Sequence, residues 1–331
     1  MKSSKPRIFV TRPIPGPGIS MLKKKGYRVD LQPKNINISN RALTAAVKEY
    51  DAILCLLTNR FDAKILNSAG SPLKIISNYA VGYDNIDIEA AKAKSIMIAN
   101  TPCQEVSNAV SEHTFALILA LSRRLVEADS FTRAKKYKGW DPNLLIGRDL
   151  GNLTLGVIGL GNIGKGVVHR AVKGFGMNVL YNDMKQDTAF EKEYGAHYVT
   201  QANLLKQSDI VSLHVPLLPS TRHLMNAKTL KLMKKDAILI NTARGPIVDE
   251  TAVLHALYSK KIGGYGLDVL ECEPSIDCNP NDRYELRALD SVIMTPHIAS
   301  ATVAARDAMS RIAAENIIEA LEGKSPIHKV I

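Results

Sequence analysis

The feature that most constrains this chain is a glycine fingerprint, Gly159-x-Gly161-x-x-Gly164, near the middle of its 331 residues. The fingerprint follows an apolar strand candidate, 154–158, and opens a helical pattern that runs to Phe175. Gly159 permits a tight turn, Gly161 lets the main chain approach a pyrophosphate, and Gly164 lets helix and strand pack closely. The free N–H groups at the start of the helix then face the phosphates. The segment therefore predicts the strand–loop–helix unit of a dinucleotide-binding sheet.

A second strand candidate, 178–182, ends directly before Asp183, which stands 19 positions after Gly164. In dinucleotide-binding sheets, an acidic residue about 20 positions past the fingerprint holds the hydroxyls of the adenosine ribose. A carboxylate there also repels the additional phosphate of NADP, so the sequence favours NAD. Two alternatives stay open: Asp183 also suits an ordinary turn at a strand end, and Lys185 weakens the preference against NADP.

Short apolar runs alternate with longer helical patterns in two blocks of the chain. Such alternation predicts an α/β protein with two doubly wound parallel sheets covered by helices. A length of 331 residues also suits two domains better than one. The strand candidates are 7–10, 27–31, 52–57, 74–77 and 95–98 in the first block, and 154–158, 178–182, 209–215, 236–241, 264–269 and 291–295 in the second.

The segment between the two blocks has a different character. Residues 106–125 are apolar on most sides and predict a buried helix. The stretch that follows, 127–152, is polar and contains the only tryptophan, Trp140. A last helix is predicted over 302–322, with Gly323 ending it.

Composition limits the partners that the chain can have. The formal net charge is +11, but the lysines are scattered in short runs typical of solvated helix faces, so we expect no nucleic-acid partner. No apolar run is long enough to span a bilayer and the polar start does not resemble a signal peptide, which predicts a cytoplasmic protein without a membrane partner. The cysteines form no CxxC pair and have no zinc-finger spacing to histidine, so we expect reduced thiols and no metal site at Cys55, Cys103, Cys272 and Cys278.

Three polar residues follow three strand candidates of the second block. Arg244 follows 236–241, Glu273 follows 264–269 and His297 follows 291–295. In an open α/β sheet, ligands bind at the carboxyl ends of the strands. Each of the three could be structural taken singly, but all three lie downstream of a dinucleotide loop, which indicates a catalytic set.

The three residue types match the reduction of a 2-oxo acid. Arg244 can grip the carboxylate and the adjacent carbonyl with its planar donors. Hydride transfer to C2 leaves an alkoxide that must be protonated, which His297 suits at neutral pH. Glu273 would stabilise the protonated imidazole and fix its orientation. The sequence therefore predicts an NAD-dependent dehydrogenase for a small 2-oxo or 2-hydroxy acid.

With these residues in place, the chain resembles the D-isomer-specific 2-hydroxyacid dehydrogenase family over essentially its whole length, and within it is most similar to the glyoxylate and hydroxypyruvate reductases. The matching stretches are 78–87, 159–164, 241–245, 266–274 and 295–300. The resemblance implies a Rossmann domain for NAD at 103–298, inserted into a flavodoxin-like substrate domain made of 1–102 plus 299–331, with the active site in the cleft between them. It also implies a homodimer formed through the cofactor domain, with Trp140 reaching the neighbouring subunit's site.

The resemblance also assigns roles to single residues. It implies that Arg244 and His297 bind the substrate together with the main chain of Ala80, Val81 and Gly82. It places Asp268 against the nicotinamide amide, His214, Val215 and Pro216 in the adenine pocket, and Thr242 and Ala243 on the nicotinamide side. The full set of expected cofactor contacts is Gly159, Gly161, Asn162, Ile163, Gly164, Asp183, His214, Val215, Pro216, Thr221, Thr242, Ala243, Arg244, Asp268 and His297.

Several functions on this scaffold stay open at this point. The expected reaction is reduction of glyoxylate, hydroxypyruvate or a similar acid to the D-2-hydroxy acid. A D-lactate dehydrogenase or a phosphite dehydrogenase would carry the same Arg, Glu and His. A non-catalytic NAD-sensing protein, like the corepressors of this fold, is an alternative of another class.

Overall fold

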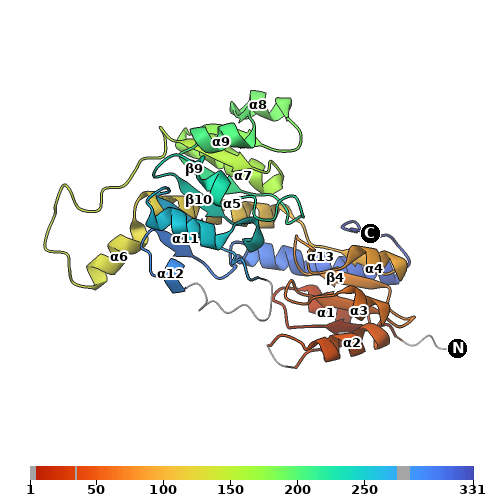
Figure 1. The fold of residues 1–331 in the computed structure, drawn as a ribbon. Helices are drawn as coiled ribbons and strands as arrows, with labels where there is room; N and C mark the ends of the chain where they lie inside the picture. The colour runs from red at the N-terminus through yellow and green to blue at the C-terminus, as the bar shows by residue number, and fades with distance from the viewer. Residues whose placement is uncertain (1–4, 34–35, 274–283) are drawn as a thin grey trace. The chain divides into compact units, whose positions relative to one another are not determined.

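The computed structural model describes residues 5–33, 36–273 and 284–331 (Figure 1). These residues divide into two compact units. Unit 1 takes the described residues up to Val106 together with Ala301–Ile331, and unit 2 takes those from Ser107 to Ser300. The first unit is therefore discontinuous in sequence, and its boundaries lie a few residues from 102 and 299.

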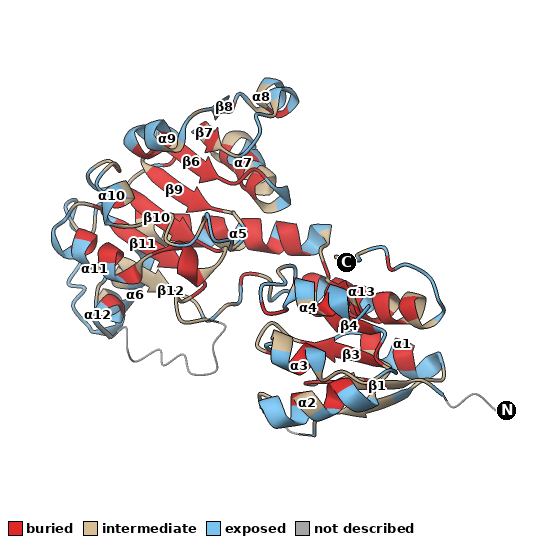
Figure 2. Ribbon diagram, turned by 45° about the vertical axis from the view of Figure 1, so that its right-hand side comes forward, coloured by how far each residue is buried: buried red, intermediate tan, exposed pale blue. Residues whose placement is uncertain are grey.

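Unit 1 is built on a parallel sheet of five strands in the order β2-β1-β3-β4-β5. This is the order of flavodoxin-like sheets. The central strands are buried along their whole length, as parallel strands covered on both faces must be (Figure 2). The strands are β1 (Arg7–Val10), β2 (Arg28–Leu31), β3 (Ala52–Cys55), β4 (Ile75–Asn78) and β5 (Met97–Ala99).

The last helix of the chain packs on this first sheet. Helix α13 (Val303–Leu321) contacts β3, β4 and α1 (Gly18–Lys24). Gly18 is required where α1 meets it, because a Cβ there would collide with the main-chain oxygen of Ser310. Ser77 of β4 also donates to the Ala313 carbonyl at 3.0 Å. The other helices of unit 1 are α2 (Asn40–Glu49), α3 (Ala63–Asn67) and α4 (Ile88–Ala93).

Unit 2 is built on a parallel sheet of seven strands in the order β12-β11-β10-β9-β6-β7-β8. Counted from β6 as the first strand, this is the doubly wound order of dinucleotide-binding folds with one strand added at the edge. The strands are β6 (Thr154–Ile158), β7 (Asn178–Asn182), β8 (His197–Tyr198), β9 (Ile210–Leu213), β10 (Ile238–Asn241), β11 (Gly264–Leu267) and β12 (Val292–Met294).

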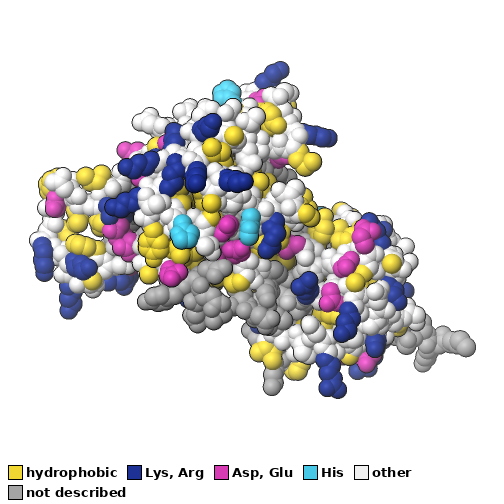
Figure 3. All heavy atoms as spheres, viewed as in Figure 1, with side chains coloured by type: hydrophobic (Ala, Val, Ile, Leu, Met, Phe, Trp, Pro, Cys, Tyr) yellow, Lys and Arg dark blue, Asp and Glu magenta, His cyan; other side chains and the backbone are white. Residues whose placement is uncertain are grey.

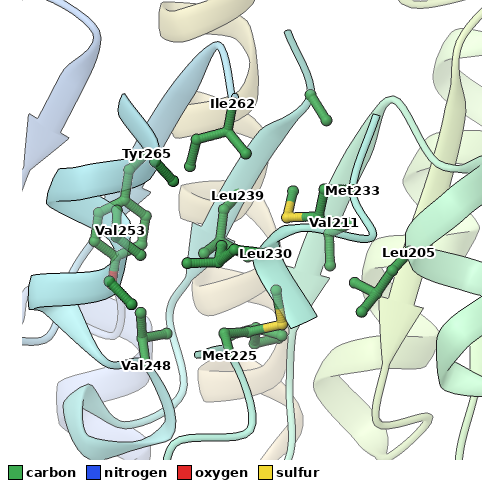
Figure 4. Close-up of a cluster of buried hydrophobic side chains, with 14 of the residues drawn as sticks. Leu205, Val211, Met225, Leu230, Met233, Leu239, Val248, Val253, Ile262 and Tyr265 are labelled. Carbon is green, nitrogen blue, oxygen red and sulfur yellow. The ribbon is translucent and has the colours of Figure 1, made fainter. Parts of the chain in front are cut away.

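The helices of unit 2 cover both faces of its sheet. They are α5 (Gln104–Ser122), whose first turn carries the boundary between the units, α6 (Leu125–Arg133), α7 (Asn162–Phe175), α8 (Thr188–Tyr194), α9 (Gln201–Gln207), α10 (Ala227–Leu230), the 3₁₀ turn η1 (Gly245–Ile247), α11 (Glu250–Tyr258) and α12 (Tyr284–Arg287). One core, shown in Figure 4, joins β9, β10 and β11 to the helices on one side, with Leu239, Val253 and Tyr265 at its centre. Each fully buried aliphatic side chain of this kind contributes about 1.5–3 kcal/mol.

The expected α/β class with two parallel sheets is confirmed. The strands predicted at 209–215, 264–269 and 291–295 end earlier than expected, because their last residues leave the sheet to form the site loops. Two elements were missed. Helix α6 lies within the stretch read as polar, and β8 has only two residues.

Candidate active site

The glycine loop has the geometry expected of a phosphate-binding turn. Gly159 has φ +97°, and a Cβ there would lie 2.6 Å from the His214 carbonyl. A Cβ on Gly164 would collide with the Gly159 carbonyl, so both positions are restricted to glycine by the protein itself. Gly161 is different, because nothing lies within 4 Å of a Cβ built there. Open space at a glycine that starts α7 fits close approach by a pyrophosphate.

The start of α7 supports the same conclusion. Gly161 is the N-cap residue, so no side chain caps the first N–H groups of this 14-residue helix. Such N–H groups, together with the helix dipole, favour an anion. The residues of this loop, including Asn162 and Ile163, therefore fit the phosphates of a dinucleotide.

Asp183 lies against the glycine loop, as the sequence predicts. It follows β7 directly, its Oδ2 accepts from the Leu160 N–H at 2.5 Å, and its Oδ1 accepts from the Met184 N–H at 2.6 Å. The side chain is only partly exposed. Both bonds fix the carboxylate at the carboxyl end of the sheet, and each oxygen has a further lone pair for a ribose hydroxyl.

The loop after β9 carries the residues expected at the adenine. His214 Nε2 lies 2.8 Å from the Ser212 Oγ, and desolvation lowers the pKa of His214 to about 3, so the imidazole is neutral near pH 7. The Val215 side chain lies next to Gly159. Thr221 donates to the Pro216 carbonyl at 2.7 Å and accepts from the Leu218 N–H at 2.8 Å. The recorded contacts of Thr221 thus hold the loop in shape.

Residues 242–244 leave the sheet at the end of β10. Thr242 is buried and its hydroxyl lies 3.0 Å from that of Thr114 on α5. Asn241 binds this turn from both ends, accepting from the Ala243 N–H at 3.1 Å and donating to the Arg244 carbonyl at 2.9 Å. The Arg244 guanidinium donates to the Ala243 carbonyl at 2.8 Å. These hydrogen bonds fix the main chain at Arg244, and the residue is half-buried.

The structure brings together His297 and Glu273, the two residues that the sequence predicts as an acid–base pair. His297 Nδ1 lies 2.7 Å from Glu273 Oε2, and the two side chains are 34% and 25% exposed. Glu273 Oε1 also accepts from the Leu270 N–H at 3.2 Å. Because Nδ1 faces the carboxylate, Nε2 is the ring atom that can reach a substrate. His297 has φ +56°, a conformation that costs free energy and persists only where the surroundings hold it.

Asp268 supplies that hold. Its Oδ1 accepts from the Ile298 N–H at 2.8 Å and from the Thr295 hydroxyl at 2.6 Å, and its Oδ2 accepts from the Ala299 N–H at 2.7 Å. The His297 N–H donates to the Asp268 carbonyl at 2.9 Å. The contact of this buried carboxylate with the nicotinamide amide stays a prediction, whereas its contacts to the His297 loop were not foreseen.

His113 was also missed by the sequence reasoning. It lies on α5, with Nε2 at 2.9 Å from the Thr295 hydroxyl and 3.6 Å from Asp268 Oδ1. No signal in the sequence sets it apart, because α5 also carries other polar residues, among them Glu112 and Thr114.

In unit 1, the loop 79–83 follows β4 and presents main chain. Val81 is exposed, and the carbonyls of three consecutive residues are held by the protein. The Thr101 N–H donates to Ala80 at 2.9 Å, Asn100 Nδ2 to Val81 at 2.7 Å and Asn78 Nδ2 to Gly82 at 2.9 Å. With the carbonyls engaged, the N–H groups of Val81 and Gly82 are the donors that a carboxylate could use.

A chain of buried amides lies beneath this loop. Asn78 donates to Asn85 Oδ1 at 3.1 Å, and Asn85 donates to the Asn59 carbonyl at 2.9 Å. Thr11 in turn donates to Asn59 Oδ1 at 2.6 Å. All four side chains are at most 5% exposed. Asn78 and Asn85 belong to the matching stretch 78–87, but the sequence predicts no role for them, because neither amide is chemically reactive.

The expectation of four reduced thiols was wrong for Cys272, which is disulfide-bonded. A search for CxxC spacing misses such a bond, because a disulfide requires two Cβ atoms close in space rather than a particular spacing in sequence. Cys55 and Cys103 are free, and burial raises the pKa of both thiols. Cys278 lies outside the described residues.

Two other kinds of site are absent from the described residues. Among the described residues, no helix is long and apolar enough to cross a membrane, and no group of three or more His, Cys, Asp or Glu side chains could hold a metal ion. On the face shown in Figure 3, Lys and Arg side chains are spread over both units with acidic side chains among them.

Comparison with known proteins agrees with this geometry. The family model described as "D-isomer specific 2-hydroxyacid dehydrogenase, NAD binding domain" matches residues 115–299. A glyoxylate reductase from Thermococcus litoralis is 44% identical over 326 residues, covering 97% of this chain and 96% of that protein. A solved glyoxylate reductase from Paecilomyes thermophila has a TM-score of 0.86 at 28% identity and covers 99% of this chain and 98% of its own. A D-lactate dehydrogenase from Aquifex aeolicus, complexed with NAD and lactic acid, has a TM-score of 0.83 at 29% identity over 96% of each chain.

A phosphate-binding glycine loop and a histidine–carboxylate pair at the carboxyl edge of one doubly wound sheet define a nicotinamide-dependent dehydrogenase. The family match covers more than half of the chain, and the relatives align over nearly all of it. The chain belongs to the D-isomer-specific 2-hydroxyacid dehydrogenase family and is an NAD-dependent oxidoreductase.

Proposed function

We propose that this enzyme reduces glyoxylate, hydroxypyruvate or a 2-oxo acid of similar size to the D-2-hydroxy acid. The observation that carries the proposal is the 2.7 Å contact between His297 and Glu273, at the same sheet edge as the glycine loop. The choice of substrate is supported by the 44% identity to a glyoxylate reductase over nearly the whole chain.

The reaction assigns one task to each residue of the set. NADH, when bound, supplies the hydride that adds to C2. His297 gives the proton on Nε2 to the oxygen that becomes the hydroxyl. The carbonyl thus gains one hydride, which carries both electrons, and one proton. Glu273 stabilises the imidazolium before that transfer and keeps Nδ1 as the donor toward itself. Arg244 holds the carbonyl oxygen and carboxylate through its planar donors.

The carboxylate of the substrate requires donors without competing charge. The N–H groups of Val81 and Gly82 supply them in this proposal, with Ala80 completing the turn. Support comes from the hydrogen bonds that hold the three carbonyls. The buried hydrogen-bonded side chains beneath the loop hold these N–H groups in place, so binding of the carboxylate requires little reorganisation.

The remaining cofactor assignments are also part of the proposal. The N–H groups of α7 would bind the pyrophosphate, Asp183 the ribose, and the loop 214–216 the adenine. A neutral His214 suits an apolar adenine pocket. Thr242, Ala243 and Asp268 would lie on the nicotinamide side. Selectivity for NADH over NADPH follows from the charge of Asp183.

We also propose that the enzyme is a cytoplasmic homodimer that associates through unit 2. The segment 125–146 exposes several large apolar side chains, among them Leu125, Val126, Tyr137, Trp140 and Ile146, and Trp140 is 84% exposed. A groove of about 550 Å³ also lies between α5 and α7, lined in part by Phe115, Leu119 and Phe175. Apolar exposure of this extent is typical of an interaction surface. Light scattering after gel filtration should give twice the mass of the 36.2 kDa chain. The double variant Trp140→Ser with Leu125→Ser should lower the measured mass to that of a single chain.

The function itself is tested by turnover. Oxidation of NADH should be followed with glyoxylate, hydroxypyruvate, pyruvate and phenylpyruvate side by side, and the series repeated with NADPH. We expect glyoxylate and hydroxypyruvate to give the highest kcat/KM. Chiral analysis of the product of hydroxypyruvate reduction should give the D-isomer. Preference for pyruvate would indicate a D-lactate dehydrogenase instead. No turnover of any of the four would contradict the proposal.

A further inference from the structure

Two glutamates outside the predicted set bind each other reciprocally, because the main-chain N–H of each donates to the side-chain carboxylate of the other. The Glu250 N–H donates to Glu271 Oε2 at 3.1 Å, and the Glu271 N–H donates to Glu250 Oε1 at 2.7 Å. Glu250 starts α11 and is 1% exposed, and the Glu271 side chain is 17% exposed. Removing carboxylates from water is costly unless hydrogen bonds compensate for it. Such a reciprocal pair therefore fixes two segments of main chain against each other.

The two segments are those that carry the proposed catalytic groups. One leaves β10 at Arg244, turns through η1 and reaches Glu250. The other follows β11 and carries Glu271 two residues before Glu273. Their main chains touch directly, since a Cβ on Gly245 would collide with the Leu270 carbonyl. The glutamate pair thus fixes the register between the arginine loop and the turn that holds Glu273.

A histidine ties a third segment to the same carboxylate. His223 Nε2 lies 2.7 Å from Glu271 Oε1, and the His223 N–H donates to the Pro246 carbonyl at 2.9 Å. His223 has φ +48°, so its conformation has to be held by these contacts. It belongs to the loop that also carries the expected adenine contacts. Loop, arginine segment and catalytic turn therefore meet at Glu271.

Tyr265 completes the surroundings of the pair. It is fully buried on β11, and burial together with the charges of Glu250 and Glu271 raises the pKa of its hydroxyl, so the phenol stays neutral at working pH. Glu250, His223 and Tyr265 are thus titratable groups that face Glu271.

We propose that Glu271, held by Glu250 and His223, is a positioning residue that sets Glu273 against His297. Glu271 does not touch the reacting atoms in this proposal. It acts through the turn 270–273, whose displacement would lengthen the 2.7 Å contact that stabilises the protonated imidazole. The inference rests on the proposed function, because it assumes that His297 is the proton donor and Glu273 its partner.

The test is Glu271→Ala in the full-length enzyme. We expect kcat to fall roughly 10- to 100-fold, since small displacements of catalytic groups cost up to about 10² in rate. The alkaline limb of the pH profile of kcat/KM should move to lower pH, because the imidazolium loses part of its stabilisation. The Kd for NADH, measured by fluorescence, should stay within about twofold, a range too small to indicate a lost contact. Glu271→Gln keeps an oxygen acceptor for the Glu250 N–H. We therefore expect it to move the alkaline limb of the kcat/KM profile in the same direction, but by less.

Two further variants make the result specific. Glu89→Gln removes an exposed carboxylate, 2.9 Å from Lys92 on α4, and should leave both kcat and the pH profile as in the wild type. Glu250→Gln combined with Glu271→Gln should cost less than the sum of the single changes, because each change weakens one of the two hydrogen bonds that join the same two segments.

Failure of the inference can be told apart from failure of the proposed function. Glu273→Ala is measured in parallel. If it leaves the pH profile unchanged, the acid–base assignment is wrong. If it shifts the profile while Glu271→Ala and Glu271→Gln lower only the melting temperature, Glu271 is merely structural and the inference is overturned. Should Glu271→Ala fail to fold, the smaller shift expected for Glu271→Gln decides the question.

Discussion

The two sheets of this enzyme have the same kind of architecture, but they place opposite chemistry at their carboxyl edges. At the edge of unit 2 stand ionisable side chains, including Arg244, Glu273 and His297. At the edge of unit 1 stand neutral, buried groups, Asn78 and Asn85, beneath a loop of exposed main chain. The difference fits the proposed division of labour, in which one edge moves protons and the other holds a carboxylate.

The contrast has a physical reason. A group that donates a proton must be accessible and partly solvated, which the 34% exposure of His297 allows. A group that only positions main-chain donors benefits from burial, because a satisfied amide network is rigid and does not change charge with pH. Fold alone would not reveal this, since both sheets are parallel and doubly wound.

The largest effect is expected from His297→Ala. Loss of a general acid lowers turnover by about 10² to 10⁴, so kcat for hydroxypyruvate reduction should fall by that factor. His169→Ala, on the exposed face of α7, is the matched control and should keep wild-type turnover. A kcat within threefold of wild type (about 0.7 kcal/mol) would remove His297 from the chemistry.

Arg244→Ala should come next. Loss of a charged, bidentate contact to the substrate is expected to lower kcat/KM roughly 10²-fold, with KM raised and kcat lowered. Arg244→Lys should recover only part of this, because an ammonium cannot reproduce the planar fork. Steady-state kinetics with Arg311→Ala as the control gives the comparison. Unchanged kinetics in Arg244→Ala would show that the arginine is structural.

A smaller effect is expected at the cofactor. Asp183→Ser removes the charge that repels the phosphate of NADPH, so the ratio of kcat/KM for NADPH to that for NADH should rise about tenfold, equivalent to about 1.4 kcal/mol. Asp187→Asn, which alters the nearby contact to Lys165 at 2.8 Å, is the control. An unchanged ratio would refute the assignment of Asp183 to the ribose.

The smallest effect concerns stability. His214 has a pKa of about 3 in the folded protein, below its ordinary value near 6.5. Between these two values the unfolded chain binds one proton more than the folded one, so the free energy of unfolding falls as pH falls, by at most about 1.4 kcal/mol per pH unit. Chemical denaturation from pH 7 to pH 5 should show a shallower dependence in His214→Gln than in wild type or in His255→Gln. Equal slopes in all three would contradict a His214 that stays neutral in the folded protein.

Much of this molecule could be predicted from its sequence, and the exceptions share a cause. The glycine loop, Asp183 and the His297–Glu273 pair were found because their residue types are tied to a definite chemistry. The cofactor contact given to Asp268 stays a prediction, and its hydrogen bonds to the His297 loop were not foreseen. Glu250, Glu271 and Asn59 were overlooked because their roles depend on contacts between distant segments, which no local pattern reveals. Helix α6 was missed because its polar composition gives no clear periodicity of apolar residues, so that its helical structure depends on tertiary context.

The division of labour between the two edges is tested most directly by Asn78→Ala, measured for kcat and KM with the same 2-oxo acid as His297→Ala. Asn78 donates to the Gly82 carbonyl and so supports the carboxylate-binding loop without reaching the chemistry. The account predicts that Asn78→Ala raises KM about tenfold, the effect of weakening one buried hydrogen bond, while kcat changes less than about threefold. A folded Asn78→Ala protein that loses kcat as His297→Ala does, at unchanged KM, would contradict the account.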